Sequence, residues 1–205
     1  MNLNFAQTEY DDEEIEAVVK TLGTRWIASG PQNEAFETEF AEYIGVKYAI
    51  AVNSGSSANL LALTSLGLSR GSKVLTAACG FPATLSPIIH LGLDPVLADY
   101  DLETHNIDKL WLLLKADAML IAHTLGNPVN MDVFPSNTSI IEDCCEAFGS
   151  LYKKRKVGSF GTLGTFSFYP AHQMTCEGTG GAIVTNNEQL AKECRSLRDW
   201  GKVWD

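Results

Sequence analysis

Short apolar segments alternate with stretches of helical spacing through residues 48–141, and this alternation constrains the fold more than any other feature. The predicted strands are mostly apolar and occupy Tyr48–Val52, Val74–Ala78, Pro95–Ala98, Met119–Ala122 and Ser139–Ile141. The helical stretches between them are Ser56–Leu66, Ala83–Leu91 and Ile107–Lys115. Apolar strands separated by helices indicate βαβ units and a mostly parallel sheet buried on both faces. The sequence therefore predicts an α/β fold.

Different patterns flank this region. Before it, apolar residues at helical spacing predict helices at Asp11–Leu22 and Asn33–Ile44, and the first has acidic residues where they complement the helix dipole. After it, Leu151–Val184 is rich in glycine and aromatic residues and predicts short strands linked by turns. A helix is then expected at Asn187–Trp200, capped by Asn187 or by the residue before it.

Composition excludes several classes of protein. The chain has 205 residues, 15 Lys+Arg against 25 Asp+Glu and a net charge of −10, so it lacks the basic surface that a nucleic-acid backbone requires. No apolar run approaches the roughly 20 residues of a membrane span, and the acidic start differs from a signal peptide. Five cysteines without a CxxC pair favour a reducing, cytoplasmic location. We expect one domain, or one domain with a fragment of a second, and neither nucleic acid nor membrane as a partner.

Polar groups stand directly after four of the predicted strands, where open α/β sheets bind ligands. They are Asn53–Ser57, Cys79–Phe81, His123–Asn127 and Asp143. In the first group, main-chain N–H groups at a helix N-terminus can bind an anion, although a plain serine cap explains the same residues. Asp143 either caps a helix or pairs with a protonated nitrogen of a ligand. Each group alone leaves these alternatives open.

A run of small and aromatic residues, Gly164–His172, ends in a histidine and is followed by the pair Gly180-Gly181. His172 is either a general base or a hydrogen-bonded structural residue. The two glycines mark a tight turn or a close approach of two backbones.

In this order, the segments resemble the DegT/DnrJ/StrS family of nucleotide-sugar aminotransferases and dehydratases, which are fold-type-I pyridoxal-phosphate (PLP) enzymes. The resemblance covers residues 10–200 and rests on RWIASGP, FETEFAEYIG, AVNSGSSANLLAL, KVLTAACGFPATLSPI, GLDPVLADYDLETHNID, AHTLGNPVNMD, IIEDCCEAFGS, VGSFGTLGTFSFYPAHQ and GTGGAIVTN. It implies a three-layer α/β/α domain of the aspartate-aminotransferase type, with a mostly parallel sheet. It also implies an N-terminal helical segment, residues 1–45, followed by a PLP-binding large domain, residues 46–205.

The resemblance also assigns cofactor contacts within this chain. Gly55 and Ser56 stand where the family binds the cofactor phosphate, and Ser167 occupies a second hydroxyl position near that phosphate. Phe81 stands where the family stacks an aromatic ring on the pyridine face. The implied cofactor is PLP or pyridoxamine phosphate (PMP).

Two carboxylates complete the implied cofactor site. Asp143 matches the residue that pairs with the pyridinium nitrogen and so keeps the ring an electron sink. Glu146 replaces a polar residue, often Gln or His, that lies near the cofactor or the sugar.

The chain departs from the family's usual pattern at one decisive position. Where the family has a lysine that forms a Schiff base with the cofactor, this sequence has His172. Imidazole cannot form that bond, so the cofactor is expected to be held non-covalently. The motifs YPAH and HTLGNP resemble one branch, the dehydratases that remove the 3-hydroxyl of nucleotide-linked 4-keto-6-deoxyhexoses. In that branch a histidine is the general base, a role that suits a side chain whose pKa lies near neutrality.

Two other functions remain open on the sequence. A sugar aminotransferase is disfavoured by His172, because the nearest lysines (Lys153, Lys154 and Lys156) lie in a predicted surface hairpin. A truncated, non-catalytic homologue with a binding role would keep the fold without turnover.

The family's smaller C-terminal domain is expected to be absent, because the chain stops at Asp205. The resemblance implies a nucleotide-sugar substrate and a homodimer or a complementing second polypeptide. One dehydratase subgroup carries an iron–sulfur cluster, but the cysteines here lack the spacing of its ligands, so no metal is expected.

Overall fold

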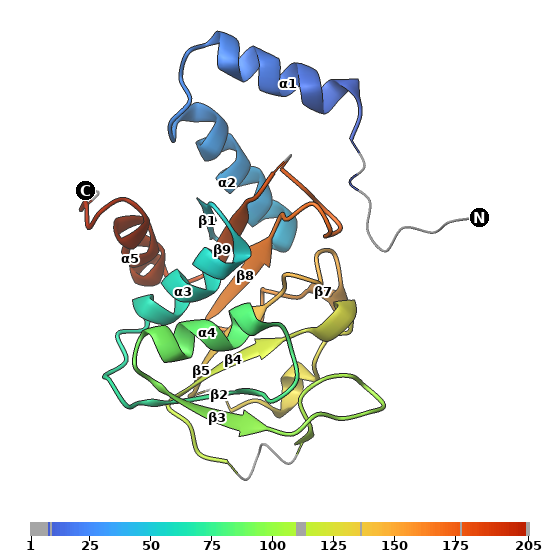
Figure 1. Ribbon diagram of the computed structural model, residues 1–205, viewed down its shortest axis with the longest axis vertical. Helices are drawn as coiled ribbons and strands as arrows, with labels where there is room; N and C mark the ends of the chain where they lie inside the picture. The colour runs from blue at the N-terminus through green and yellow to red at the C-terminus, as the bar shows by residue number, and fades with distance from the viewer. Residues whose placement is uncertain (1–7, 9, 110–113, 136, 177, 204–205) are drawn as a thin grey trace.

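The computed structural model describes residues 8, 10–109, 114–135, 137–176 and 178–203. Within them, seven strands form one sheet in the order β1-β9-β8-β5-β4-β2-β3 (Figure 1). The strands are β1 (Tyr48–Val52), β2 (Lys73–Ala77), β3 (Asp94–Ala98), β4 (Ala118–Ala122), β5 (Ser139–Asp143), β8 (Leu163–Ser167) and β9 (Gly181–Thr185). β9 is antiparallel to β1 and β8, whereas the other neighbours pair in parallel. The predicted, mostly parallel sheet is confirmed.

The α-helices of the described residues agree with the predicted ranges to within two residues at each end. They are α1 (Asp12–Gly23), α2 (Pro31–Ile44), α3 (Gly55–Ser65), α4 (Pro82–His90) and α5 (Glu188–Arg198). Asn187 caps α5, since its side chain accepts hydrogen bonds from two first-turn amides. Shorter elements are the 3-10 helices η2 (Thr124–Gly126) and η3 (Met131–Val133) and the hairpin strands β6 (Leu151–Tyr152) and β7 (Arg155–Lys156).

The sheet separates two hydrophobic layers. On one face, Ile50 packs in a core with residues of α3, α4 and α5. On the other face its neighbour Ala49 packs with Phe40 and Ile44 of α2. Adjacent residues of a strand point to opposite faces, so one apolar strand serves both cores. The predicted three-layer α/β/α arrangement is confirmed.

The helix predicted at Ile107–Lys115 is wrong at its first residue. Ile107 forms an antiparallel bridge with Tyr100 and is buried in a core with Ala98 and Val129. Burial beside the end of β3 therefore overrides the local helical spacing. Residues 110–113 of this range lie outside the described part of the chain.

The N-terminal helices differ in their contacts with the rest of the molecule. α2 buries Phe40, Ala41 and Ile44, whereas α1 buries none of its residues and lies away from the sheet (Figure 1). The division between residues 1–45 and 46–205 stays a prediction. No described helix has the length and apolar character needed to cross a membrane.

Side chains protect the exposed edge of the sheet at β1. The main-chain N–H of Ala51 donates to Glu37 Oε1 at 2.9 Å. Arg195 donates to the carbonyl of Ala49 and Arg198 to that of Ala51, both at 3.2 Å. Both arginines also pair with the Glu37 carboxylate. A carboxylate and two guanidinium groups thus form hydrogen bonds with main-chain groups of β1 that a neighbouring strand would otherwise bind.

Candidate functional site

The loops that carry the predicted site residues meet at the carboxyl ends of the parallel strands. β1, β5 and β8 run in the same direction, so the segments after Val52, Asp143 and Ser167 emerge together (Figure 1). β9 runs the other way and begins there, with Gly181 paired to both Val52 and Ser167. Open α/β sheets bind their ligands at these carboxyl ends of the strands.

A narrow space bounded by Gly55, Ser167 and Cys145, the cradle, lies where α3 begins. A Cβ atom at Gly55 would lie 2.6 Å from Cβ of Ser167 and 2.8 Å from Sγ of Cys145, so only glycine fits. The structure thus brings Gly55 and Ser167 together as predicted, and Ser56 follows at the exposed helix N-terminus. The first amides of a helix have no acceptor within the helix and favour an anion.

The serine cap is present as well as the cradle. Ser54 is the N-cap of α3, and its hydroxyl accepts from the amide of Ser57 at 3.1 Å. A close approach of backbones is confirmed at Gly181, where a Cβ would lie 2.6 Å from the carbonyl of Ser54. The cap orients α3, and the glycine lets β9 approach it.

Asp143 is buried at the end of β5 and lies in a hydrogen-bonded network. Its Oδ2 accepts from Asn59 Nδ2 at 2.8 Å and from Thr84 Oγ1 at 2.7 Å, and its Oδ1 accepts from the amide of Cys145 at 3.2 Å. The helix-cap alternative is wrong, because residues 144–150 form turns. A carboxylate has about four acceptor positions, and these N–H and O–H donors occupy three of them. The Cys145 thiol, a weak donor, is a further hydrogen-bond partner of this carboxylate.

The partners of Asp143 were not predicted from the sequence. Asn59 is buried one helical turn after Gly55, and its Oδ1 accepts from Thr165 Oγ1 at 2.6 Å. Thr84 lies in the first turn of α4. One signal could have indicated these partners: each is a polar residue at a position of a predicted helix or strand where an apolar residue would be expected.

Phe81 and Glu146 border this network. Phe81 is the N-cap residue of α4, one turn before Thr84, and its side chain is 69% exposed and thus available to a ligand. Glu146 Oε2 accepts from the amide of Leu125 at 3.0 Å, and its carbonyl accepts from Gln173 Nε2 at 2.9 Å. Glu146 therefore joins the loops that follow β4, β5 and β8.

His172 lies half-buried in the loop between β8 and β9. Its amide donates to the carbonyl of Tyr169 at 2.9 Å, and its ring lies edge-on to the Tyr169 ring with centroids 6.2 Å apart. No hydrogen bond between described residues joins its imidazole to Asp143 or Glu146. The protein thus positions His172 through the loop backbone.

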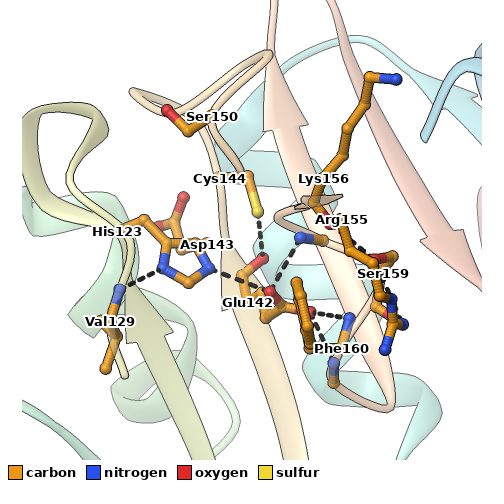
Figure 2. Close-up of polar contacts among 12 residues, drawn as sticks. His123, Val129, Glu142, Asp143, Cys144, Ser150, Arg155, Lys156, Ser159 and Phe160 are labelled. Atoms are coloured by element: carbon orange, nitrogen blue, oxygen red, sulfur yellow. Dashed lines mark hydrogen bonds and ion pairs between the residues drawn. The ribbon is translucent and has the colours of Figure 1, made fainter. Parts of the chain in front are cut away.

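A second polar centre lies around Glu142, on the opposite side of β5 from Asp143 (Figure 2). His123 Nε2 and the amide of Gly158 contact Glu142 Oε2, and the amides of Phe160 and Gly161 donate to Oε1. The amide of Val129 donates to His123 Nδ1, so the ring proton is on Nε2 and is donated to Glu142.

These bonds exclude a metal site at this centre. His123, Glu142 and Cys144 offer ligand atoms within 4.8 Å of one another. The protonated Nε2 has no lone pair, and the four donors occupy the carboxylate of Glu142. The centre instead fixes the turn that leads into β8, a role that no sequence motif indicated.

Electrostatics keep the thiol beside the cradle protonated. Burial raises the pKa of Cys145 well above its ordinary value, and the charge of Asp143 raises it further.

The hairpin lysines lie elsewhere: Lys153 pairs with Asp132, and Lys156 lies 4.1 Å from the centre of the Tyr43 ring. A cavity of about 710 Å³ adjoins the cradle at Ser57, but neither Asp143 nor His172 lines it.

Comparison with known proteins identifies the family of the chain. The sequence pattern of the DegT/DnrJ/EryC1/StrS aminotransferase family matches residues 8–205. The chain belongs to this family. The Salmonella typhimurium lipopolysaccharide biosynthesis protein RfbH is 43% identical over 207 residues, which cover 93% of this chain and 47% of RfbH.

Two further members of the family are similar to the chain. The dTDP-4-dehydro-2,6-dideoxy-D-glucose 3-dehydratase of Saccharopolyspora spinosa is 43% identical, over 94% of this chain and 45% of its own. The structure of E. coli GDP-4-keto-6-deoxy-D-mannose-3-dehydratase with bound hydrated PLP superposes with a TM-score of 0.92 at 32% identity, covering 97% of this chain and 55% of its own. The chain spans about half the length of the curated relatives it matches.

Proposed function

We propose that this chain is the cofactor-binding half of a PMP-dependent dehydratase that removes the 3-hydroxyl of a nucleotide-linked 4-keto-6-deoxyhexose. One observation carries the proposal: His172 stands in the loop after β8, where the usual family pattern has a lysine. The relatives named as 3-dehydratases support the same reaction class.

The residues of the site fit a phosphorylated pyridine. The cradle at Gly55, with Ser56 and Ser167 beside it, suits a phosphate because it joins a helix N-terminus to two hydroxyls. Asp143 offers an oriented carboxylate for the ring N–H, which as a stronger donor can take the place of the weakly donating Cys145 thiol. Phe81 presents an exposed ring for stacking.

Asp143 and His172 then have separate roles in the proposed reaction. The bound cofactor supplies an amine for the sugar ketone and a ring that accepts electron density. Asp143 holds the proton on the ring nitrogen through a carboxylate fixed by Asn59 and Thr84. His172 accepts a carbon-bound proton at a ring nitrogen, a contribution typically of about 10²–10⁴-fold to the rate.

An aminotransferase is the second candidate, because proteins named as aminotransferases also match, including the aminotransferase of Psychrobacter cryohalolentis. By the usual family pattern, an aminotransferase needs a lysine near the cradle to form a Schiff base with the cofactor. The ion pair of Lys153 with Asp132 and the stacking of Lys156 on Tyr43 hold two of the nearest lysines in the hairpin region. The dehydratase is therefore favoured.

The proposed protein is a homodimer, or pairs with a second polypeptide, and acts in the cytoplasm. The dimer is supported by α1, whose apolar side chains Ile15, Val18, Val19 and Leu22 are all exposed. Contiguous exposed apolar groups of this kind mark interfaces. The five free cysteines suit a reducing compartment.

The test exploits the difference between histidine and lysine. His172→Lys should form a covalent bond with PLP that borohydride traps as a mass increase on the peptide containing residue 172. The wild type and the matched surface variant His90→Lys should give no adduct at these positions. His172→Asn should bind PMP with unchanged affinity in calorimetry.

The opposite result would contradict the proposal directly. Binding of PLP by His172→Lys without an adduct at residue 172 would show that this position is not at the reacting centre. An adduct in the wild type on any lysine of the hairpin would favour the aminotransferase.

A further inference from the structure

The loop that carries His172 is unusually long for the strands it connects. β8 and β9 are antiparallel neighbours, yet residues 168–180 separate them. Loops between such strands commonly have about two to five residues, and loops of about a dozen are usually functional. A long loop needs its own attachments if one of its side chains is to be placed accurately.

Gln173 provides an attachment directly beside His172. Its side-chain amide donates to the carbonyl of Glu146 at 2.9 Å. Glu146 follows Asp143 by three residues, in the turn that starts where β5 ends. The bond thus joins the loop of the proposed base to the segment of the proposed pyridinium partner.

Glu146 is itself fixed on its other side. Its carboxylate accepts from the amide of Leu125, which has a left-handed backbone with φ of 53° in the loop after β4. Other contacts of the His172 loop reach different parts of the molecule: Thr8 donates to Pro170, and Phe168 and Met174 pack on the α2 core.

We propose that Gln173 is a positioning residue, and that its bond to Glu146 sets the place of His172 relative to Asp143. The inference rests on the proposed function, because it requires His172 to be the reacting base. The acceptor is a main-chain carbonyl, so the contact depends on an N–H donor at position 173 and not on the Glu146 side chain. Gln173→Glu keeps the size of the side chain but turns the donor into an acceptor.

The experiment measures placement of residue 172 without needing turnover. In the His172→Lys background, we expect Gln173→Glu to slow adduct formation with PLP at residue 172 by about 10- to 100-fold, since small misplacements of reacting groups carry losses of this size. PMP affinity, measured by calorimetry with Gln173→Glu alone, should change less than about twofold. Gln189→Glu, an exposed glutamine of α5, is the matched control and should leave the rate unchanged.

The outcomes separate this inference from the proposed function. Equal trapping rates with and without Gln173→Glu would overturn the positioning role while leaving His172 as the base. Absence of an adduct in His172→Lys itself would overturn both. If Gln173→Glu failed to fold, Gln173→Ala would replace it in the same rate comparison, because Gln173 is exposed and its truncation removes only the donor.

Discussion

At the scale of single residues, the site depends on how Asp143 is held. The carboxylate is nearly buried and receives hydrogen bonds from an amide of α3 and a hydroxyl of α4. Hydrogen bonds to a charged group are stronger than neutral ones, and here they fix the orientation of the carboxylate. The orientation of Asp143 thus depends on Asn59 and Thr84, which the sequence did not single out, and on Cys145, whose thiol borders the cradle at Gly55.

Thr84→Val tests the contribution of one such bond. The side chain keeps its shape but no longer donates to Asp143, so we expect the free energy of unfolding to fall by about 1.5–3 kcal/mol. Urea unfolding measures the change. Thr38→Val is the control, because its hydroxyl bonds only the backbone of its own exposed helix. Equal effects of the two variants would contradict a special role for Thr84.

Thiol reactivity should report the burial beside the cradle. The pKa of Cys145 is raised by burial and by Asp143, so at about pH 8 its thiol stays protonated and alkylation by iodoacetamide should be slow. Its rate should increase as the pH rises toward the raised pKa, because only the thiolate reacts. Cys79 is exposed and should be alkylated first, as peptide mass spectrometry can show. Faster labelling of Cys145 than of Cys79 at that pH would contradict this environment.

At the scale of elements, the edge strand β1 depends on side chains instead of a neighbouring strand. Glu37 joins α2 to this edge and to both arginines of α5. Its removal takes the carboxylate from Arg195 and leaves Arg198 with Asp199 alone, and both arginines are largely buried, so the loss should exceed that of a surface pair.

Glu37→Ala should therefore lower the free energy of unfolding by about 1–3 kcal/mol, a range reduced for the partial exposure of the pair. Thermal unfolding and aggregation assays measure the loss, and the freed edge should also increase aggregation. Glu188→Ala removes an exposed pair with Lys192 and should have a much smaller effect. A comparable loss in both variants would show that the edge contacts add nothing.

At the scale of the whole molecule, α1 is a helix with no buried residue among those described. Its acidic first turn and capping box stabilise the helix locally, but none of its apolar side chains is buried. A helix face with Val18 and Leu22 one turn apart is the expected contact in the proposed dimer.

Sedimentation at micromolar concentration should detect that dimer. Leu22→Glu should weaken it by about 10- to 100-fold in dissociation constant, because burial of one such side chain stabilises by about 1.5–3 kcal/mol. Lys20→Glu changes the charge on the other side of α1 and should leave association intact. A wild type that sediments as a monomer would refute the interface.

The sequence alone predicted most of the helices and strands, and it predicted that a site would lie at the carboxyl ends of the parallel strands. Apolar runs and helical spacing are local signals, so they predicted the parallel strands and placed Gly55 and Asp143 after two of them. The family resemblance then singled out His172, although its role as the base stays a prediction.

Which polar groups meet depends on the tertiary fold. Asn59 and Asp143 are 84 residues apart, so their bond depends on strand order and not on any local pattern. Ile107 pairs with Tyr100 against its helical spacing, since burial beside β3 outweighs weak local propensity. The Glu142 centre likewise needs His123 and the turn before β8 on one side of β5. Local periodicity specifies elements, whereas a network of buried polar groups exists only once distant segments are packed together.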